Sequence, residues 1–197
     1  MSVLLRIRCS LAESPARCEW VLFGENGTAV AGEGALGELP HADRAQLVIP
    51  AAQTVFTRVR LPSAALRQRR GAVLAFAVEE RTIGEPNAAA VSWVGTAGDE
   101  DVLAVVDRGG LERWRSALAD LGWHAPEIHC ETLLLPVVPG EWSLAWDGSE
   151  GFVRSGEFEG AALDCGDAGA PPLALRLMLE EAREREAAPA AIALYTD

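Results

Sequence analysis

The order of the predicted elements constrains this chain more than any single motif, because one order occurs twice. Near the N-terminus, three short β-prone runs are followed by a fourth at 46–49. Near the C-terminus, three more such runs precede a helical pattern at 173–186 and a last strand at 192–195. The pairs Asn-Gly at 26–27 and Asp-Gly at 147–148 predict tight turns between strands. Each end of the chain is therefore expected to form three antiparallel strands, a helix or short turn, and a fourth strand.

This doubled order predicts an α/β chain with an actin-like architecture, in which two ribonuclease H-like lobes are built on the same plan. In the first copy, only a short helix fits between the third and fourth strands. The middle of the chain adds a helical pattern from Ser63 to about Arg81, two strands, and a second helix that ends before Gly122. We therefore expect three ranges: a first lobe over 1–55, an inserted strand-helix domain over 56–124, and a second lobe over 125–197.

The composition indicates a folded chain with an acidic surface. Hydrophobic residues make up 49% of the 197 residues and charged residues 23%, which suits a sizeable buried core. The formal net charge of -12 argues against general nucleic-acid binding, because neutralising phosphates requires clustered cations. A partner with a basic surface would be attracted instead. We therefore expect a protein partner and no nucleic acid.

The basic residues and the cysteines limit the reactions that the chain could catalyse and indicate its cellular compartment. All 17 basic residues are arginine, so the chain has no lysine for a Walker A phosphate loop or a Schiff base. The 4 cysteines are scattered without a Cys-x-x-Cys pair, which is typical of structural thiols in a reducing compartment. The sequence has no signal-peptide pattern at its start and no apolar run long enough to span a bilayer. These features predict a soluble, cytosolic chain.

Two glycine-containing segments invite a phosphate-binding interpretation, but their surroundings favour structural roles. Residues 32–37 match Gly-x-Gly-x-x-Gly, yet the preceding strand belongs to a hairpin and Pro40 prevents a long helix close behind. Glu33 would also place a carboxylate beside the phosphate. Residues 107–110 join a strand to a helix, where short loops commonly contain glycine for geometric reasons. A turn and a connecting loop are the preferred interpretations.

Metal and nucleotide chemistry lack a complete set of residues. His124 and His129 are five residues apart, which misses the helical ligand spacing, and on a strand Cys130 would face away from His129. The Asp147-Gly148 turn resembles part of an actin-like phosphate loop, but such an ATPase needs a matching loop in its first lobe, and neither 25–27 nor 10–15 supplies one. We therefore predict no catalytic residue, no metal site, no cofactor and no enzymatic activity.

The helical pattern that begins at Ser63 carries charges in an unusual order. Arginines occupy its N-terminal half and glutamates its C-terminal end, so both groups oppose the helix dipole at a cost of about 0.3–1 kcal/mol per exposed charge. Contacts with a partner could offset this cost, whereas an ordinary solvated face is the alternative interpretation. The candidate partner-binding residues are Arg67, Arg70, Glu79, Glu80 and Arg81.

An ordered set of segments resembles the cytoplasmic region of the type II secretion system protein L (GspL) family. The first group of matching segments is 47–50, 57–62, 67–70 and 75–80. The second group is 102–107 with the Trp114 helix, 126–127, 133–136, 142–148 and 152–156. The resemblance covers most of the chain, and its specificity comes from the order of the segments rather than from any single one.

The resemblance implies an actin-like fold of two ribonuclease H-like lobes with an extra sheet domain, in a family that has lost nucleotide hydrolysis. It implies that the chain recruits the N-terminal domain of the secretion ATPase at the cytoplasmic face of the bacterial inner membrane. A membrane helix and a periplasmic domain that pairs with protein M are expected to follow in the complete protein. A homodimer is compatible with such a platform.

Two further expectations concern the end of the chain and the competing function. In an actin-like lobe, another helix and strand should follow Tyr195, so we expect the second lobe to be incomplete at its C-terminus. The alternative function is an actin-like nucleotide-binding protein or ATPase of the pilus-assembly platform class. That class keeps its nucleotide-binding loops, so binding of nucleotide separates the two hypotheses.

Overall fold

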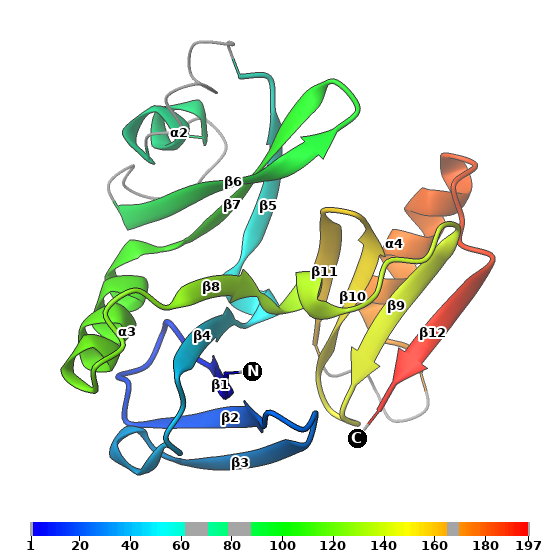
Figure 1. The fold of residues 1–197 in the computed structure, drawn as a ribbon. Helices are drawn as coiled ribbons and strands as arrows, with labels where there is room; N and C mark the ends of the chain where they lie inside the picture. Colours follow the sequence, from blue (N-terminus) through cyan, green and yellow to red (C-terminus); the bar gives the residue numbers. More distant parts are fainter. Residues whose placement is uncertain (1, 62–70, 79–87, 165–169, 197) are drawn as a thin grey trace. The chain divides into compact units, whose positions relative to one another are not determined.

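The structure, a computed structural model, describes residues 2–61, 71–78, 88–164 and 170–196. Its contacts divide the chain into two compact units, Met1–Cys130 and Glu131–Asp197. Each unit has its own sheets and its own buried apolar clusters, and the clusters of the two units share no residue (Figure 1).

The first unit is built on a five-stranded sheet in the order β3-β2-β1-β4-β8 (Figure 1). Its central strand β1 is antiparallel to β2 and parallel to β4, while β2 and β3 form a hairpin. β8 extends the sheet by running parallel to β4. The strands are β1 (Leu4–Arg8), β2 (Arg17–Phe23), β3 (Ala29–Ala35), β4 (Arg44–Ile49) and β8 (Glu127–Cys130).

Turn chemistry explains the β2–β3 hairpin that the sequence predicts. Gly27 adopts a φ of +80°, which glycine tolerates because it has no Cβ atom. The Asn26 side-chain oxygen accepts hydrogen bonds from the Thr28 amide at 3.2 Å and from the Thr28 hydroxyl at 2.7 Å. The predicted Asn-Gly turn is confirmed. The 3-10 helix η1 (Leu36–Glu38) follows β3 and η2 (Ala51–Gln53) follows β4.

Helix α3 (Arg108–Asp120) covers one face of this sheet. The Asp107 carboxylate caps its N-terminus by accepting from the Gly110 amide, and Gly122 ends it with a φ of +95°, as predicted. The Trp114 indole is 1% exposed and donates to the Ser10 carbonyl at 2.9 Å. The core between helix and sheet contains Leu5, Ile7, Cys9, Leu11, Leu47, Ile49, Leu111, Trp114 and Leu118.

A smaller sheet lies between β4 and α3 in the sequence. It has the order β5-β7-β6, with both neighbouring pairs antiparallel, and comprises β5 (Val55–Val59), β6 (Ala89–Ala97) and β7 (Glu100–Asp107). Helix α2 (Gly71–Val78) packs against it (Figure 1). Val59, Leu74, Val78, Val91, Leu103 and Val105 form the buried cluster between them.

The second unit contains a four-stranded sheet in the order β11-β10-β9-β12 and the helix α4. Its elements are the 3-10 helix η5 (Glu131–Leu134), β9 (Glu141–Trp146), β10 (Gly151–Gly156), β11 (Glu159–Leu163), α4 (Leu173–Glu184) and β12 (Ala191–Tyr195). β9 is antiparallel to β10 and parallel to β12. Trp142, Val153, Leu163 and Leu175 form its core, so one face of α4 packs on the sheet.

The two larger sheets repeat one topology. In each, three successive strands pair antiparallel, and the fourth pairs parallel with the first of them. The connection before the fourth strand is α4 in the second unit but contains only η1 in the first. The doubled order predicted from the sequence is confirmed, including the short connection in its first copy.

Two elements lie elsewhere than the predicted ranges placed them. The range 125–197 assigned β8 to the second lobe, whereas β8 pairs with β4 in the sheet of the first unit. The range 56–124 assigned α3 to the inserted domain, whereas α3 buries its apolar face mainly against the five-stranded sheet. Both differences arise from contacts between residues far apart in the sequence. The division into three domains over 1–55, 56–124 and 125–197 remains a prediction.

Candidate partner-binding site

The predicted partner-binding residues Arg67, Arg70, Glu79, Glu80 and Arg81 lie outside the described residues. The structure describes the helix between them, α2, and shows which way it faces. Leu74 and Val78 are 3% and 1% exposed against the small sheet, whereas the Phe76 side chain is 77% exposed. Residues two positions apart lie on opposite sides of a helix, so Phe76 points away from the sheet. Phe76 is an exposed aromatic residue that the charge pattern did not single out, although its position opposite Leu74 follows from helical periodicity.

A buried carboxylate organises the end of β5, next to the segment that leads to α2. Asp101 is 5% exposed and accepts hydrogen bonds from the Trp93 indole at 2.9 Å and from the Leu61 amide at 3.3 Å. A buried carboxylate is stable only when its oxygens have partners. Asp101 therefore connects β6, and Leu61 two residues beyond β5, to β7, within the sheet against which α2 packs.

The candidate metal residues do not all belong to one element of the structure. His124 is exposed after α3, while His129 on β8 places its Nε2 atom 3.7 Å from a Glu127 carboxylate oxygen, beyond hydrogen-bond distance. Burial raises the pKa of the Cys130 thiol, which opposes the thiolate that a metal requires. Within the described ranges, no group of three metal-ligating side chains comes together.

Glu127 belongs instead to a polar network across β1, β4 and β8. Its carboxylate accepts a 2.6 Å hydrogen bond from the Gln46 side chain, which in turn accepts from Arg6 Nε at 2.8 Å. Arg44 lies 3.6 Å from the same carboxylate. The Gln46 hydrogen bond, and then the Arg44 charge, lower the pKa of Glu127. The network holds the edge strand β8 in register with β4.

The glycine-rich segment and the Asp-Gly turn have structural roles. A Cβ atom on Gly32 would lie 2.5 Å from the Trp20 ring, so this glycine makes room for an aromatic side chain on the neighbouring strand. The Asp147 carboxylate accepts hydrogen bonds from the Ser149 and Glu150 amides at 2.8 and 2.9 Å. Gly148 has a φ of +102°. The predicted hairpin turn is confirmed, and the Asp147 carboxylate is engaged within it.

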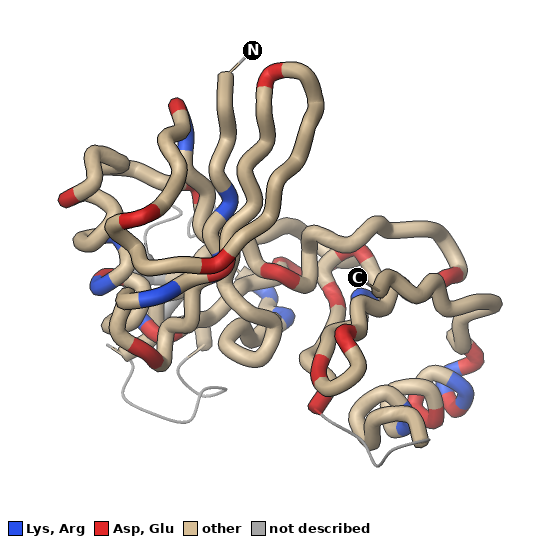
Figure 2. The backbone as a smooth tube through the Cα atoms, turned by 90° about the horizontal axis from the view of Figure 1, so that it is seen from below, with Lys and Arg blue, Asp and Glu red and all other residues tan. Residues whose placement is uncertain are grey.

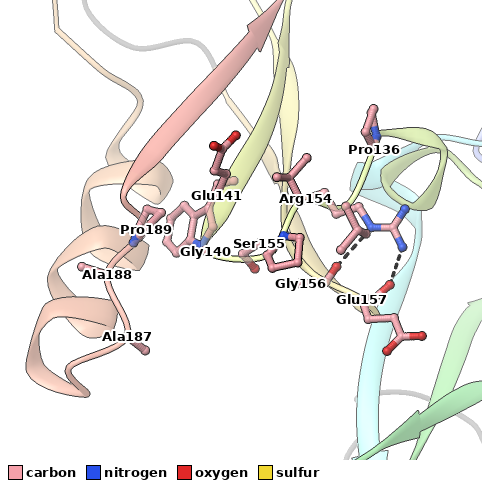
Figure 3. A pocket seen from close by; sticks show the side chains of 14 residues that line it. Pro136, Gly140, Glu141, Arg154, Ser155, Gly156, Glu157, Ala187, Ala188 and Pro189 are labelled. Carbon is pink, nitrogen blue, oxygen red and sulfur yellow. Dashed lines mark hydrogen bonds between the residues drawn. The ribbon is translucent and has the colours of Figure 1, made fainter.

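The second unit contains a pocket of about 320 Å³ that no sequence motif indicated (Figure 3). Three loops form it: the connection 136–140, the β10–β11 turn at 154–157, and 187–189 before β12. Its wall is mostly apolar, and Glu141 and Glu157 lie on opposite sides of it in Figure 3. The sequence signal that could have found it is the run Pro136-Val-Val-Pro139, where apolar residues stand outside any helix or strand.

Arg154 is the only basic residue among those that line the pocket, and its guanidinium is occupied by the backbone. Its Nη1 atom donates to the Leu133 carbonyl at 2.6 Å and to the Leu135 carbonyl at 2.7 Å. Nε donates to the Gly156 carbonyl at 3.1 Å, and Nη2 donates to the Glu157 carbonyl (Figure 3). Burial lowers the pKa of this guanidinium, although arginine stays charged. Arg154 on β10 therefore connects this strand to the 131–135 segment and to the β10–β11 turn through hydrogen bonds.

Comparison with known proteins relates this fold to a secretion system. A family model described as Type II secretion system (T2SS), protein L, matches residues 5–180. A type II secretion system protein L from Klebsiella pneumoniae is 29% identical over 134 residues, which are 68% of this chain and 33% of that protein. The chain thus spans about a third of the length of this curated relative.

Solved structures share the fold. The cytoplasmic domain of EpsL, an inner membrane component of the type II secretion system of Vibrio cholerae, has a TM-score of 0.75 at 21% identity, over 100% of this chain and 83% of that one. A Bacteroides thetaiotaomicron protein with an actin-like ATPase fold and unknown function has a TM-score of 0.53 at 8% identity, over 98% and 81%. These similarities confirm the predicted actin-like fold.

Within the described part of the chain, no helix has the length and apolarity needed to cross a membrane. Because the family model matches nearly the whole sequence, the chain belongs to the type II secretion system protein L family.

Proposed function

We propose that this chain is a non-catalytic part of the type II secretion inner-membrane platform, and that it recruits the secretion ATPase at the cytoplasmic face of the membrane. The observation that carries this proposal is the family match over residues 5–180. The similarity to a domain described as the cytoplasmic part of an inner membrane component supports the location. The formal net charge of -12 favours a partner with a basic surface, because complementary charge speeds association.

The docking surface that we propose is centred on α2. Phe76 exposes an aromatic side chain there, and the candidate residues Arg67, Arg70, Glu79, Glu80 and Arg81 flank the helix in the sequence. Aromatic and arginine side chains are enriched among residues that dominate binding energy at protein interfaces. A ring that is 77% exposed leaves a large apolar area for a partner to cover.

Calorimetric titration with the purified N-terminal domain of the cognate secretion ATPase tests this proposal. We expect a complex that weakens with salt, and an affinity loss of about tenfold or more for Phe76→Ser. The matched control is Val30→Ser, which removes an apolar side chain that is 55% exposed on β3. Absence of heat and of co-elution at low salt would remove ATPase recruitment, and equal losses in the two variants would remove α2 as its site.

Titration with magnesium-ATP tests the competing nucleotide-binding function. The Asp147 carboxylate is engaged within its own turn, which gives no support to a phosphate loop at this position. We therefore expect millimolar magnesium-ATP to leave the melting temperature unchanged, because only a ligand that binds the native state stabilises it. A thermal shift that Asp147→Ala abolishes would favour the actin-like ATPase instead.

A further inference from the structure

The pocket of the second unit lies away from the place where an actin-like phosphate loop would form. Glu141 is the first residue of β9 and lines the pocket, whereas Asp147 begins the turn after the last residue of β9. At about 3.3 Å per residue, the length of this strand separates the two positions by roughly 20 Å. The pocket is therefore separate from any phosphate loop at Asp147.

The wall of the pocket offers apolar contact. Val137 and Val138 are 47% and 40% exposed, so their side chains remain open to a ligand. The Trp142 side chain is 7% exposed and belongs to the core of the unit, which makes this part of the wall rigid. The other apolar wall residues are Pro136, Pro139, Ala187, Ala188 and Pro189. Such a wall suits an aliphatic chain.

The polar groups of the pocket favour a cation over an anion. The Glu141 and Glu157 side chains are exposed and lie on opposite sides of it (Figure 3). Arg154, the one basic lining residue, uses four of its five N–H donors on backbone carbonyls. An anionic ligand would therefore meet two carboxylates and a guanidinium that already has partners.

The net charge of the second unit also favours a cationic ligand. The second unit, 131–197, contains 13 acidic residues and 4 arginines, a formal net charge of -9. The first unit, 1–130, contains 16 acidic residues and 13 arginines, a net charge of -3. Most of the negative charge of the chain thus belongs to its smaller unit, where acidic positions are spread over turns and α4 (Figure 2). This field attracts a basic partner and repels a second copy of the same unit.

From these observations we infer that the pocket binds an arginine side chain presented by an apolar segment of a protein partner. The aliphatic stem of the arginine lies against the Val137 and Val138 wall, and its guanidinium meets the Glu141 carboxylate, because the Glu157 carboxylate lies on the opposite side and already attracts Arg154. Arginine fits better than lysine, because its guanidinium is weakly hydrated and forms paired hydrogen bonds with carboxylates. A volume of about 320 Å³ accommodates one long side chain and part of its neighbours. This inference does not depend on ATPase recruitment through α2.

The test uses the complete 1–197 chain and a valine-arginine-valine tripeptide capped at both ends. The matched probe replaces arginine by citrulline, which has nearly the same shape and no charge. Two-dimensional amide NMR should show saturable shifts at Gly140, Ser155, Gly156 and Ala188 with the arginine peptide, at millimolar concentrations typical of a single side-chain contact. The citrulline peptide should bind at least about fivefold more weakly.

Three variants separate local contact from the general charge of the unit. Glu141→Gln should weaken binding by about threefold or more, and Glu157→Gln should weaken it less. Glu150→Gln removes the same charge from an exposed position in the β9–β10 turn, at the other end of β9, and should leave binding unchanged. Equal binding of the two peptides, equal weakening by Glu150→Gln, shifts confined to other residues, or no saturable shift at all would each overturn the inference.

Discussion

Replacing Arg154 with methionine should destabilise the second unit while keeping most of the apolar stem of the side chain. The substitution removes four hydrogen bonds that join the guanidinium to the carbonyls of Leu133, Leu135, Gly156 and Glu157. A hydrogen bond to a charged group contributes about 1.5–3 kcal/mol, but such contributions are not additive within one network. Since Arg154 is only half-buried, water can replace part of what is lost. We therefore expect a loss of about 2–4 kcal/mol in the free energy of unfolding.

Thermal unfolding and hydrogen exchange measure this effect. For a domain of this size, each kcal/mol lowers the melting temperature by about 4–8 °C, so the transition of the second unit should fall by at least about 8 °C. Exchange should accelerate first in η5 and in the β10–β11 turn, which the guanidinium joins. The matched control is Arg176→Met on the exposed face of α4, for which we expect a change within about 0.5 kcal/mol.

Equal melting temperatures for the two variants would refute the reasoning. The hydrogen bonds of the Arg154 guanidinium would then contribute no net stability, and the pocket would have to be reconsidered as an anion site. Inorganic phosphate tests that outcome directly: it should leave the melting temperature of the unmodified protein where sodium chloride of the same ionic strength leaves it.

Three further predictions concern the first unit. Gly110→Ala should cost about 1–3 kcal/mol in urea denaturation, because the new Cβ atom would lie 2.3 Å from the Leu11 carbonyl oxygen, whereas Gly37→Ala, with nothing within 4 Å, should cost far less. Gln46→Ala should raise the pKa of Glu127 toward its ordinary value in an NMR titration, because it removes the largest cause of the lowered pKa; an unchanged pKa would contradict that assignment. Glu127 contributes its full stabilisation above its unfolded-state pKa, and this contribution is lost as the pH falls through its lower folded-state pKa. The acid sensitivity of folding should therefore decrease in Gln46→Ala. Cys9, whose pKa burial raises to about 12, should resist iodoacetamide at pH 8 until urea unfolds the chain, and rapid alkylation of the native protein would disprove its burial.

At the candidate site, local sequence patterns were not sufficient to predict the structure. Helical periodicity predicts an apolar stripe through Leu74, but the exposure of Phe76 depends on α2 packing through one face only. Charge order in the sequence directs attention to Arg67 and Glu79, which lie outside the described residues. The pocket of the second unit joins three loops that are separated by long stretches of chain, so no window of the sequence contains it.

The sequence by itself determined the hairpins, the doubled order of elements and the C-terminal end of α3, because these depend on neighbouring residues: the positive φ of Gly27 and of Gly122, and alternation along each strand. Only the tertiary structure decided that β8 joins β4, that α3 covers the five-stranded sheet, and that Arg154 meets the carbonyls of the 133–135 segment. Alternation states which face of a strand is buried but not which strand lies beside it. That choice depends on hydrogen bonds and apolar contacts between distant residues, which form only when the whole unit folds.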